Sequence, residues 1–234
     1  MTMDKIIEDI KKDYKEGKLI PVIGAGCSTP FGIPDWNGLV KEIANQKLTD
    51  DSYKSVIAKE ITKGNFFKSL DLLMSEAKMN EFQLQKQVST IIQKIKSDNA
   101  NYKLVNSNYS DIADMKFKTI MTFNYDEIIY DFTPIHYYEK PIPIKDFIEP
   151  QEIGGDRNII LNLHGYVSNP QTIILSKNSY DNLYNESCPY TELLKVLAGT
   201  KKFLFLGTSL TDIYINNTKM IYISFQNMSK KIYL

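Results

Sequence analysis

Four short segments of this 234-residue chain carry side chains suited to ligand binding and chemistry, and each follows an apolar run. They combine glycines with a hydroxyl, an amide with a carboxylate, an imidazole, and a pair of hydroxyls. The segments are Gly24-Ala25-Gly26-Cys27-Ser28, Thr122-Phe123-Asn124-Tyr125-Asp126, His164-Gly165 and Gly207-Thr208-Ser209-Leu210. Because ligands of open α/β sheets bind beyond the carboxyl ends of the strands, this order predicts a dinucleotide site.

The first segment predicts a phosphate-binding turn between a strand and a helix. Gly24 and Gly26 have no Cβ to block a ligand and can adopt positive φ, and exposed N–H groups at a helix start bind phosphate. The Ser28 hydroxyl can donate a hydrogen bond to a phosphate or ribose oxygen. A tight turn without a ligand explains these residues equally well, because the third glycine of the usual dinucleotide fingerprint is missing.

The stretch after this turn is rigid and apolar and is long for a simple turn. It runs Pro30-Phe31-Gly32-Ile33-Pro34-Asp35-Trp36. We expect it to fold over a bound ribose and exclude water.

The polar residues of the other segments also have plain structural explanations. Asn124 can cap a helix by satisfying its first N–H groups, and the hydroxyls of Thr208 and Ser209 can do the same. A lone histidine such as His164 is more often structural than catalytic, although its place after a buried strand favours the ligand-binding edge. His136 belongs to no motif, and we interpret it as a packing or surface residue.

Apolar strands that alternate with helices predict an α/β fold, with a Rossmann-like, mainly parallel sheet flanked by helices. Helices are expected over residues 3–16 (with Gly17 as C-cap), 36–44 and 190–197. Strands are expected over residues 19–23, 119–122, 135–138, 159–163, 172–175 and 202–206, with one or two more in 221–225 and 231–234. Pro21 lacks an N–H group, so the first strand is expected to start near it or to lie at an edge.

Residues 49–108 are polar and patterned as helices, which predicts a single domain, 1–234, with a helical insertion here. Apolar residues recur in this stretch at helical spacing, and we favour core packing between helices over ligand contact for them. They are Phe66, Phe67, Leu70, Leu73, Met74, Phe82, Leu84, Val88, Ile91, Ile92 and Ile95.

The composition argues against several classes of function. Lys plus Arg and Asp plus Glu both number 28, and Arg157 is the only arginine, so nucleic acid is not expected as the main partner. Cys27 and Cys188 are too few for a four-cysteine zinc module, and no metal is expected. No signal-peptide core and no apolar run near the roughly 20 residues of a membrane span occur, which predicts a soluble, cytoplasmic protein without a membrane partner.

The first segment, followed by Gly32-Ile33-Pro34-Asp35, resembles the NAD-binding signature of the sirtuin family. The other three segments resemble the family's Thr-x-Asn-x-Asp, His-Gly and Gly-Thr-Ser-Leu motifs. Trp36 departs from the Phe-Arg pair of protein-deacylating sirtuins, and Thr211-Asp212 continues the last motif as in the defence-type branch. The chain is therefore most similar to the sirtuin-like NAD hydrolases of bacterial antiphage defence systems, over nearly its whole length except the helical insertion.

This resemblance implies a role for each polar residue and an activity. Asn124 would work at the ribose beside the scissile bond, Asp126 would recognise the nicotinamide carboxamide, and His164 would be the general base. The implied NAD-contacting residues are Gly24, Ala25, Gly26, Ser28, Ile33, Pro34, Asp35, Trp36, Asp126, Gly207, Thr208 and Ser209. The implied reaction is hydrolysis of NAD+ to nicotinamide and ADP-ribose, serving antiviral defence by NAD+ depletion.

Two other functions stay open at this point. NAD-dependent deacylation of protein lysines is one, although the missing cysteine quartet and Trp36 argue against it. A sensor domain that binds ADP-ribose or NAD without cleaving it is the other. Because an unregulated NAD hydrolase would be toxic to its own cell, the resemblance also implies control by homo-oligomerisation or by a partner protein, with residues 49–108 as a candidate contact.

Overall fold

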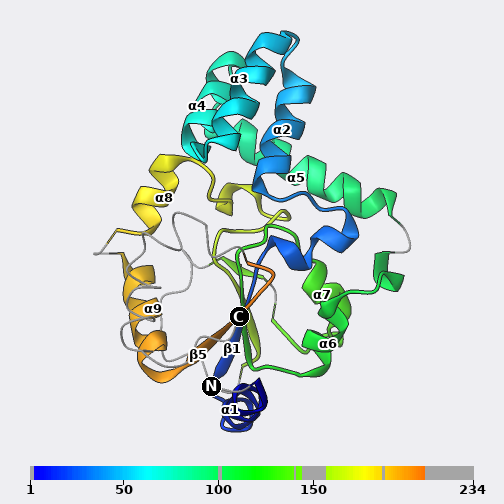
Figure 1. The fold of residues 1–234 in the computed structure, drawn as a ribbon, viewed down its shortest axis with the longest axis vertical. Coiled ribbons are helices and arrows are strands. Elements are labelled where there is room, and N and C mark those ends of the chain that lie inside the picture. The colour runs from blue at the N-terminus through cyan, green and yellow to red at the C-terminus, as the bar shows by residue number, and fades with distance from the viewer. Residues whose placement is uncertain (1–2, 100–101, 140, 144–156, 186–187, 209–234) are drawn as a thin grey trace.

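A computed structural model describes residues 3–99, 102–139, 141–143, 157–185 and 188–208. They contain a five-stranded parallel sheet of order β3-β4-β2-β1-β5, flanked by helices (Figure 1). The strands are β1 (Leu19–Ile23), β2 (Thr119–Thr122), β3 (Ile142–Pro143), β4 (Ile159–Asn162) and β5 (Lys202–Leu206). The predicted Rossmann-like α/β fold is confirmed.

The helices lie on different sides of this sheet. In Figure 1, α2–α5 lie together at the top, beyond the ends of the strands, while α6 and α7 lie on one side of the sheet and α9 on the other. The helices are α1 (Met3–Lys15), α2 (Trp36–Lys47), α3 (Asp51–Thr62), α4 (Phe66–Glu76), α5 (Glu81–Asp98), α6 (Asn108–Asp114), α7 (Ile128–Phe132), α8 (Lys177–Leu183) and α9 (Pro189–Thr200).

Both faces of the sheet are buried, which explains why its strands are continuous apolar runs. Ile20 and Val22 of β1 pack into a core with the buried leucines of α9. Leu19 and Ile23, on the other face, belong to a larger core that includes residues of α6 and α7 and continues into α2–α5. Side chains alternate along β1, so one short strand joins the two cores.

Pro21 lies in the middle of β1, an interior strand, so the expectation of an edge position or a start near this proline is wrong. The Ile23 carbonyl accepts a hydrogen bond from the residue after β2, and the Gly24 N–H donates one to β5. Successive residues of a strand direct their peptide groups to alternate neighbours, so Pro21 faces β2, as Ile23 does. The β1–β2 register begins only at Val22, and the missing N–H therefore falls where this pairing has not started.

Two predicted strands are not formed. Residues 135–138 make a turn instead, in which Ile135 is 88% exposed and His136 has a φ of 64°. Residues 172–175 follow the 3-10 turn Pro170–Thr172 and pair with no strand. Both segments have apolar composition, but each follows a proline that starts a turn.

Other elements differ from the sequence analysis in simpler ways. The short strand β3 and helices α6 and α8 were not predicted, whereas β1, β2, β4, β5 and the first helix agree with expectation within a residue. Gly17 ends the first helix with a φ of 64°, as predicted for a C-cap. The strands expected in 221–225 and 231–234 lie outside the described residues.

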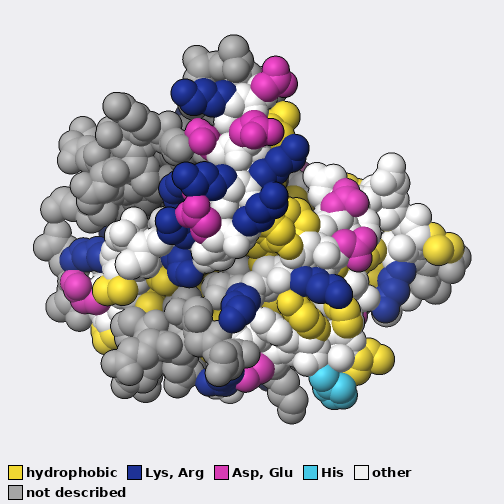
Figure 2. Space-filling model, turned by 90° about the horizontal axis from the view of Figure 1, so that it is seen from below, with side chains coloured by type: hydrophobic (Ala, Val, Ile, Leu, Met, Phe, Trp, Pro, Cys, Tyr) yellow, Lys and Arg dark blue, Asp and Glu magenta, His cyan; other side chains and the backbone are white. Residues whose placement is uncertain are grey.

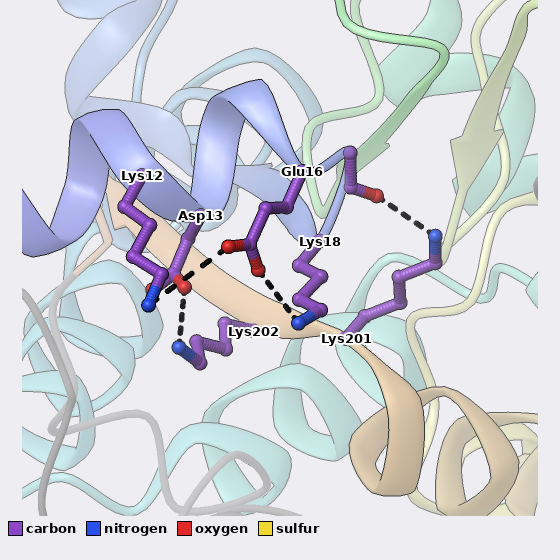
Figure 3. Close-up of polar contacts among 7 residues, drawn as sticks. Lys12, Asp13, Glu16, Lys18, Lys201 and Lys202 are labelled. Carbon is purple, nitrogen blue, oxygen red and sulfur yellow. Dashed lines mark hydrogen bonds and ion pairs between the residues drawn. The ribbon is translucent and has the colours of Figure 1, made fainter.

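Helix α1 is fastened to the starts of β1 and β5 by the polar contacts in Figure 3. Lys202 Nζ lies 2.5 Å from Oδ1 of Asp13, a carboxylate that is almost fully buried. Lys201 Nζ donates a hydrogen bond of 2.8 Å to the Gly17 carbonyl. These contacts secure the amino ends of the parallel strands, and the carboxyl ends lie at the opposite edge of the sheet.

The face of the molecule seen from below carries mixed charge (Figure 2). Seen from below, as in Figure 2, Lys and Arg side chains lie among Asp and Glu side chains over the described residues, which agrees with the balanced composition. Within the described ranges, no helix combines the length and apolar character required to cross a bilayer.

Candidate active site

A cavity of about 570 Å³ lies beyond the carboxyl ends of β1, β2, β4 and β5, within the range of roughly 300–1,000 Å³ typical of ligand sites. It brings together every predicted site residue that the structure describes, and Ser209 lies outside the described ranges. The predicted residues that line it are Gly24, Ala25, Gly26, Ser28, Ile33, Pro34, Asp35, Trp36, Asn124, Asp126, His164, Gly207 and Thr208. Among the described residues, no group of three or more His, Cys, Asp or Glu side chains is placed to hold a metal ion.

Gly24 and Gly26 allow the loop after β1 to pack directly on the loop after β5. A Cβ on Gly24 would lie 2.5 Å from Thr208 Cγ2, and one on Gly26 would lie 2.9 Å from the Gly207 carbonyl oxygen. Neither glycine has a positive φ, and that of Gly24 is −120°. The reason for these glycines is therefore the close approach of the two loops, and the positive φ that glycine can adopt is not used here.

The backbone N–H groups of this loop are mostly used within the protein. The Gly24 N–H donates to the carbonyl of Leu206, the last residue of β5, and the Gly26 N–H donates to the carbonyl of Gly207. The N–H groups of Cys27 and Ser28 close the short 3-10 turn Ala25–Cys27. In the described part of the chain, the Ala25 N–H is the one left in this segment for a ligand, so the expected array of free phosphate-binding N–H groups is not present in this conformation.

Asn124 is buried and is held by its amide nitrogen. Nδ2 lies 3.0 Å from the Gly24 carbonyl oxygen, 2.9 Å from Ser28 Oγ and 3.1 Å from the Tyr109 hydroxyl. A carbonyl oxygen only accepts hydrogen bonds, so the Gly24 contact identifies which amide atom is the nitrogen. Asn124 lines the cavity, and its side-chain hydrogen bonds to the described residues are all made by Nδ2, not by Oδ1. This oxygen is the amide atom that remains to bind a ligand.

Asp126 occupies the start of α7, and the alternative that Asn124 caps this helix is wrong. Oδ1 of Asp126 accepts a hydrogen bond of 3.1 Å from the Ile128 N–H, and Oδ2 accepts one of 2.7 Å from the Ser28 hydroxyl. Burial raises the pKa of Asp126, and these hydrogen bonds oppose part of that rise. Because the Ser28 proton is committed to Asp126, Ser28 is not free to donate to a phosphate as we expected.

Tyr109 of α6 supports this network and was missed by the sequence analysis. Its side chain is 1% exposed, and its hydroxyl lies 2.8 Å from Ser28 Oγ. The single Ser28 proton goes to Asp126, so Tyr109 must donate to Ser28. Burial raises the pKa of Tyr109 and keeps its hydroxyl protonated for this purpose. No motif marks Tyr109, because its role depends on contacts with residues distant in the sequence.

His164 follows β4 and is 4% exposed. Its Nε2 lies 2.6 Å from the Tyr184 hydroxyl, and its Nδ1 lies 3.4 Å from the Tyr180 hydroxyl. Burial lowers the pKa of His164 to about 3, so the imidazole is neutral at pH 7. A neutral imidazole has a free lone pair and can accept a proton, as a general base must.

The glycine after this histidine is required by the path of the chain. Gly165 has a φ of 81°, and a Cβ there would lie 2.1 Å from the Thr172 carbonyl oxygen. The chain turns back at this point, and the Ile174 N–H donates a hydrogen bond of 2.9 Å to the His164 carbonyl. The His-Gly pair therefore fixes the histidine at the end of β4.

Aromatic residues form a wall of the cavity that the sequence analysis assigned to the core. Phe66 and Phe67, at the start of α4, line the cavity and pack against Trp36 and Tyr180, with ring centroids 5.4 and 5.5 Å apart. Ile92 lines it too. Spacing along a helix does not distinguish a core residue from one that lines a cavity, so the pattern carried no signal for these two phenylalanines. The prediction of core packing is confirmed for the buried residues Leu70, Leu73, Leu84, Val88, Ile91 and Ile92, and it is wrong for Phe82, which is 41% exposed.

We expect His164 to make the fold less stable in mild acid. The pKa of an unfolded histidine is about 6.5 and that of His164 in the folded protein is lowered to about 3, so the unfolded chain binds the proton first. The free energy of unfolding should therefore fall as the pH decreases from about 6.5 towards about 3. Thermal unfolding at a series of pH values should show a weaker dependence in His164→Gln than in the wild type. The control is His136→Gln, which changes an exposed histidine; equal slopes in the two variants would contradict the assignment.

Comparison with known proteins relates this site to a family. The family described as SIR2-like domain matches residues 118–234. Relatives named NAD(+) hydrolase ThsA include those of Cytobacillus dafuensis (25% identical, covering 91% of this chain and 40% of the relative) and Bacillus cereus strain MSX-D12 (26% identical, covering 91% and 42%). A protein of the same name from Acinetobacter baumannii strain 532279 is 24% identical over 88% of this chain and 39% of its own length. The chain spans about two fifths of the length of these relatives.

Proposed function

This chain belongs to the SIR2-like domain family, and on that premise we propose that it hydrolyses NAD+ at the bond between nicotinamide and ribose. The products are nicotinamide and ADP-ribose. The observation that carries the proposal is that an anchored amide oxygen, on Asn124, and a neutral imidazole, on His164, line one cavity at the carboxyl ends of the strands. The name NAD(+) hydrolase of the relatives supports the same reaction.

In the proposed reaction, Asn124 orients the reacting groups and His164 accepts a proton. Nicotinamide leaves with the electron pair of the C1′–N bond and becomes neutral, and the ribose carries oxocarbenium-like positive charge, as in other glycosidic cleavages. A water molecule adds to C1′ and loses one proton. The Asn124 oxygen accepts a hydrogen bond from a ribose hydroxyl or from this water, and His164 accepts the proton of the water. The balance is NAD+ and water giving nicotinamide, ADP-ribose and one proton.

The remaining cavity residues bind and shield the substrate in this proposal. The Asp126 carboxyl group contacts the nicotinamide carboxamide, which can donate hydrogen bonds to its oxygens. Trp36, Phe66 and Phe67 form an apolar wall that excludes bulk water from the reacting carbon. Gly207 and Thr208 lie on the far side of the glycine loop, where the adenine ribose would bind.

The proposed cellular role is antiviral defence by depletion of NAD+. A hydrolase of this kind must be held inactive until it is needed, and we propose control through a second copy of the chain or a partner protein. Helices α3, α4 and α5 extend beyond the sheet and offer surface for such a contact, as part of the insertion that we propose within one domain (Figure 1).

The proposal predicts that purified protein releases nicotinamide from NAD+ without any peptide. The measurement is incubation with NAD+ followed by chromatographic detection of nicotinamide and ADP-ribose, with Asn124→Ala as the inactive control. Nicotinamide release that depends on an acetylated peptide would identify a deacylase instead. Binding of ADP-ribose with no release of nicotinamide would identify a sensor domain.

A further inference from the structure

The two ring nitrogens of His164 lie in different surroundings. Tyr180, whose hydroxyl is 3.4 Å from Nδ1, lines the cavity. Tyr184, whose hydroxyl is 2.6 Å from Nε2, is not among the described residues that line it. Nδ1 therefore lies on the side of the cavity-lining Tyr180, and Nε2 lies on the side of Tyr184.

A neutral imidazole has one N–H group and one lone pair, so only one of its nitrogens can accept a proton. The contact of 2.6 Å at Nε2 is a short hydrogen bond, whereas the contact of 3.4 Å at Nδ1 is weak and easily replaced by a ligand. If Nε2 accepted from Tyr184, the N–H group would face the cavity and His164 could not act there as a base. A base on the cavity side requires the opposite arrangement.

We infer that Tyr184 is a positioning residue whose hydroxyl oxygen accepts a hydrogen bond from Nε2–H of His164, leaving the Nδ1 lone pair to receive a proton in the cavity. This inference rests on the proposed NAD+ hydrolysis for its functional meaning. It adds a residue that no motif indicates, and it assigns the reacting atom of the base.

The geometry of α8 supports a paired action of the two tyrosines. Tyr180 and Tyr184 are four residues apart, the spacing that places side chains on one face of a helix. Their rings stack with centroids 5.8 Å apart and an angle of 17° between the planes. The Ser176 hydroxyl accepts a hydrogen bond from the Ser179 N–H at the start of this helix and donates one to Glu81 of α5, which fixes where α8 begins.

A phenol is a suitable hydrogen-bond partner for a base that must be neutral before it accepts a proton. A carboxylate at the same place would stabilise the imidazolium ion, because an opposite charge favours the charged form. The rings packed against His164 are those of Phe123, Tyr180 and Tyr184, none of which is charged. Tyr184 can therefore orient the imidazole without holding it in the protonated state.

The position of the proton can be measured without any substrate. Long-range ¹H–¹⁵N correlation spectra of the ¹⁵N-labelled chain distinguish the two tautomers of a neutral histidine, and His136→Gln identifies which signals belong to His164. We expect the proton on Nε2 in the wild type and in Tyr180→Phe, and loss of this preference in Tyr184→Phe. A proton on Nδ1 in the wild type, or an unchanged spectrum in Tyr184→Phe, would overturn the inference.

The effect on turnover separates positioning from general stability. Tyr184→Phe should lower kcat for nicotinamide release about 10–100-fold with little change in KM, as expected when a group that orients a reacting residue is removed. The matched control is Tyr138→Phe, which removes another hydroxyl bonded at 2.6 Å, to the Phe117 carbonyl at the amino end of β2. A kcat for Tyr184→Phe equal to that of this control would also overturn the inference. If the wild type releases no nicotinamide, the proposed hydrolysis fails, and the tautomer measurement still tests the His164–Tyr184 bond.

Discussion

Replacing His164 with alanine is expected to lower kcat for nicotinamide release by about 10²–10⁴-fold, the usual contribution of a general base. The imidazole lines the cavity and is neutral, so its removal takes away the group that, in the proposed reaction, accepts the proton of the attacking water. The measurement is the initial rate of nicotinamide formation at saturating NAD+. His136→Ala, which changes an exposed residue in a turn, should keep wild-type activity.

The same assignment predicts an unusual pH profile. An ordinary histidine base would lose activity as the pH falls through about 6.5. Burial lowers the pKa of His164 to about 3, so the base stays unprotonated and the acid limb of kcat/KM should lie well below pH 6.5. An acid limb of kcat/KM near pH 6.5 that disappears in His164→Ala would contradict the lowered pKa of His164. Wild-type turnover in His164→Ala would contradict the role of this histidine as the base.

Replacing Asn124 with alanine should lower kcat by about 10²–10³-fold, comparable to the loss of one preorganised hydrogen-bonding group in other active sites. The amide is fixed by three contacts of Nδ2, at Gly24, Ser28 and Tyr109, and in the proposed reaction Oδ1 orients the ribose or the water. The substitution also removes one of the two hydrogen bonds that the Gly24 carbonyl accepts, the other coming from the Cys27 N–H, so the melting temperature should fall in the same variant.

The comparison variant for this prediction is Asn80→Ala. Asn80 caps α5 with a hydrogen bond from the Gln83 N–H, and its loss should cost about 1 kcal/mol of stability without affecting turnover. If Asn80→Ala and Asn124→Ala lowered kcat equally at a temperature where both are folded, the loss would reflect stability rather than the orientation of the substrate. Asn124→Asp is expected to be inactive too, because a carboxylate oxygen would face the Gly24 carbonyl.

The sequence was sufficient to predict the part of the site that depends on the ends of strands. β1, β2, β4 and β5 are apolar runs that stop at a glycine or a polar residue, and parallel strands bring such stops to one edge. Runs of similar composition at residues 135–138 and 172–175 were predicted as strands but formed none. Local apolar content does not reveal whether a neighbouring strand is available for pairing.

Residues that act through distant contacts could not be predicted in this way. Tyr109 and Tyr184 bind site residues that lie 15 or more positions away, and neither belongs to a motif. The role of Gly24 was misjudged for the same reason, because the group that excludes a side chain there is Thr208, at the other end of the described chain. Phe66 and Phe67 match the helical spacing of core residues, and this spacing does not reveal which residues line a cavity.

The interior position of β1 determines how a truncated fragment of this protein would behave. The family match begins at residue 118, so it omits the strand that bridges β2 and β5 and the glycine loop that meets Gly207. A fragment cut at that boundary would expose the inner edges of two strands and would lack one side of the cavity. We expect such a fragment to aggregate on expression, since unpaired strand edges recruit other chains.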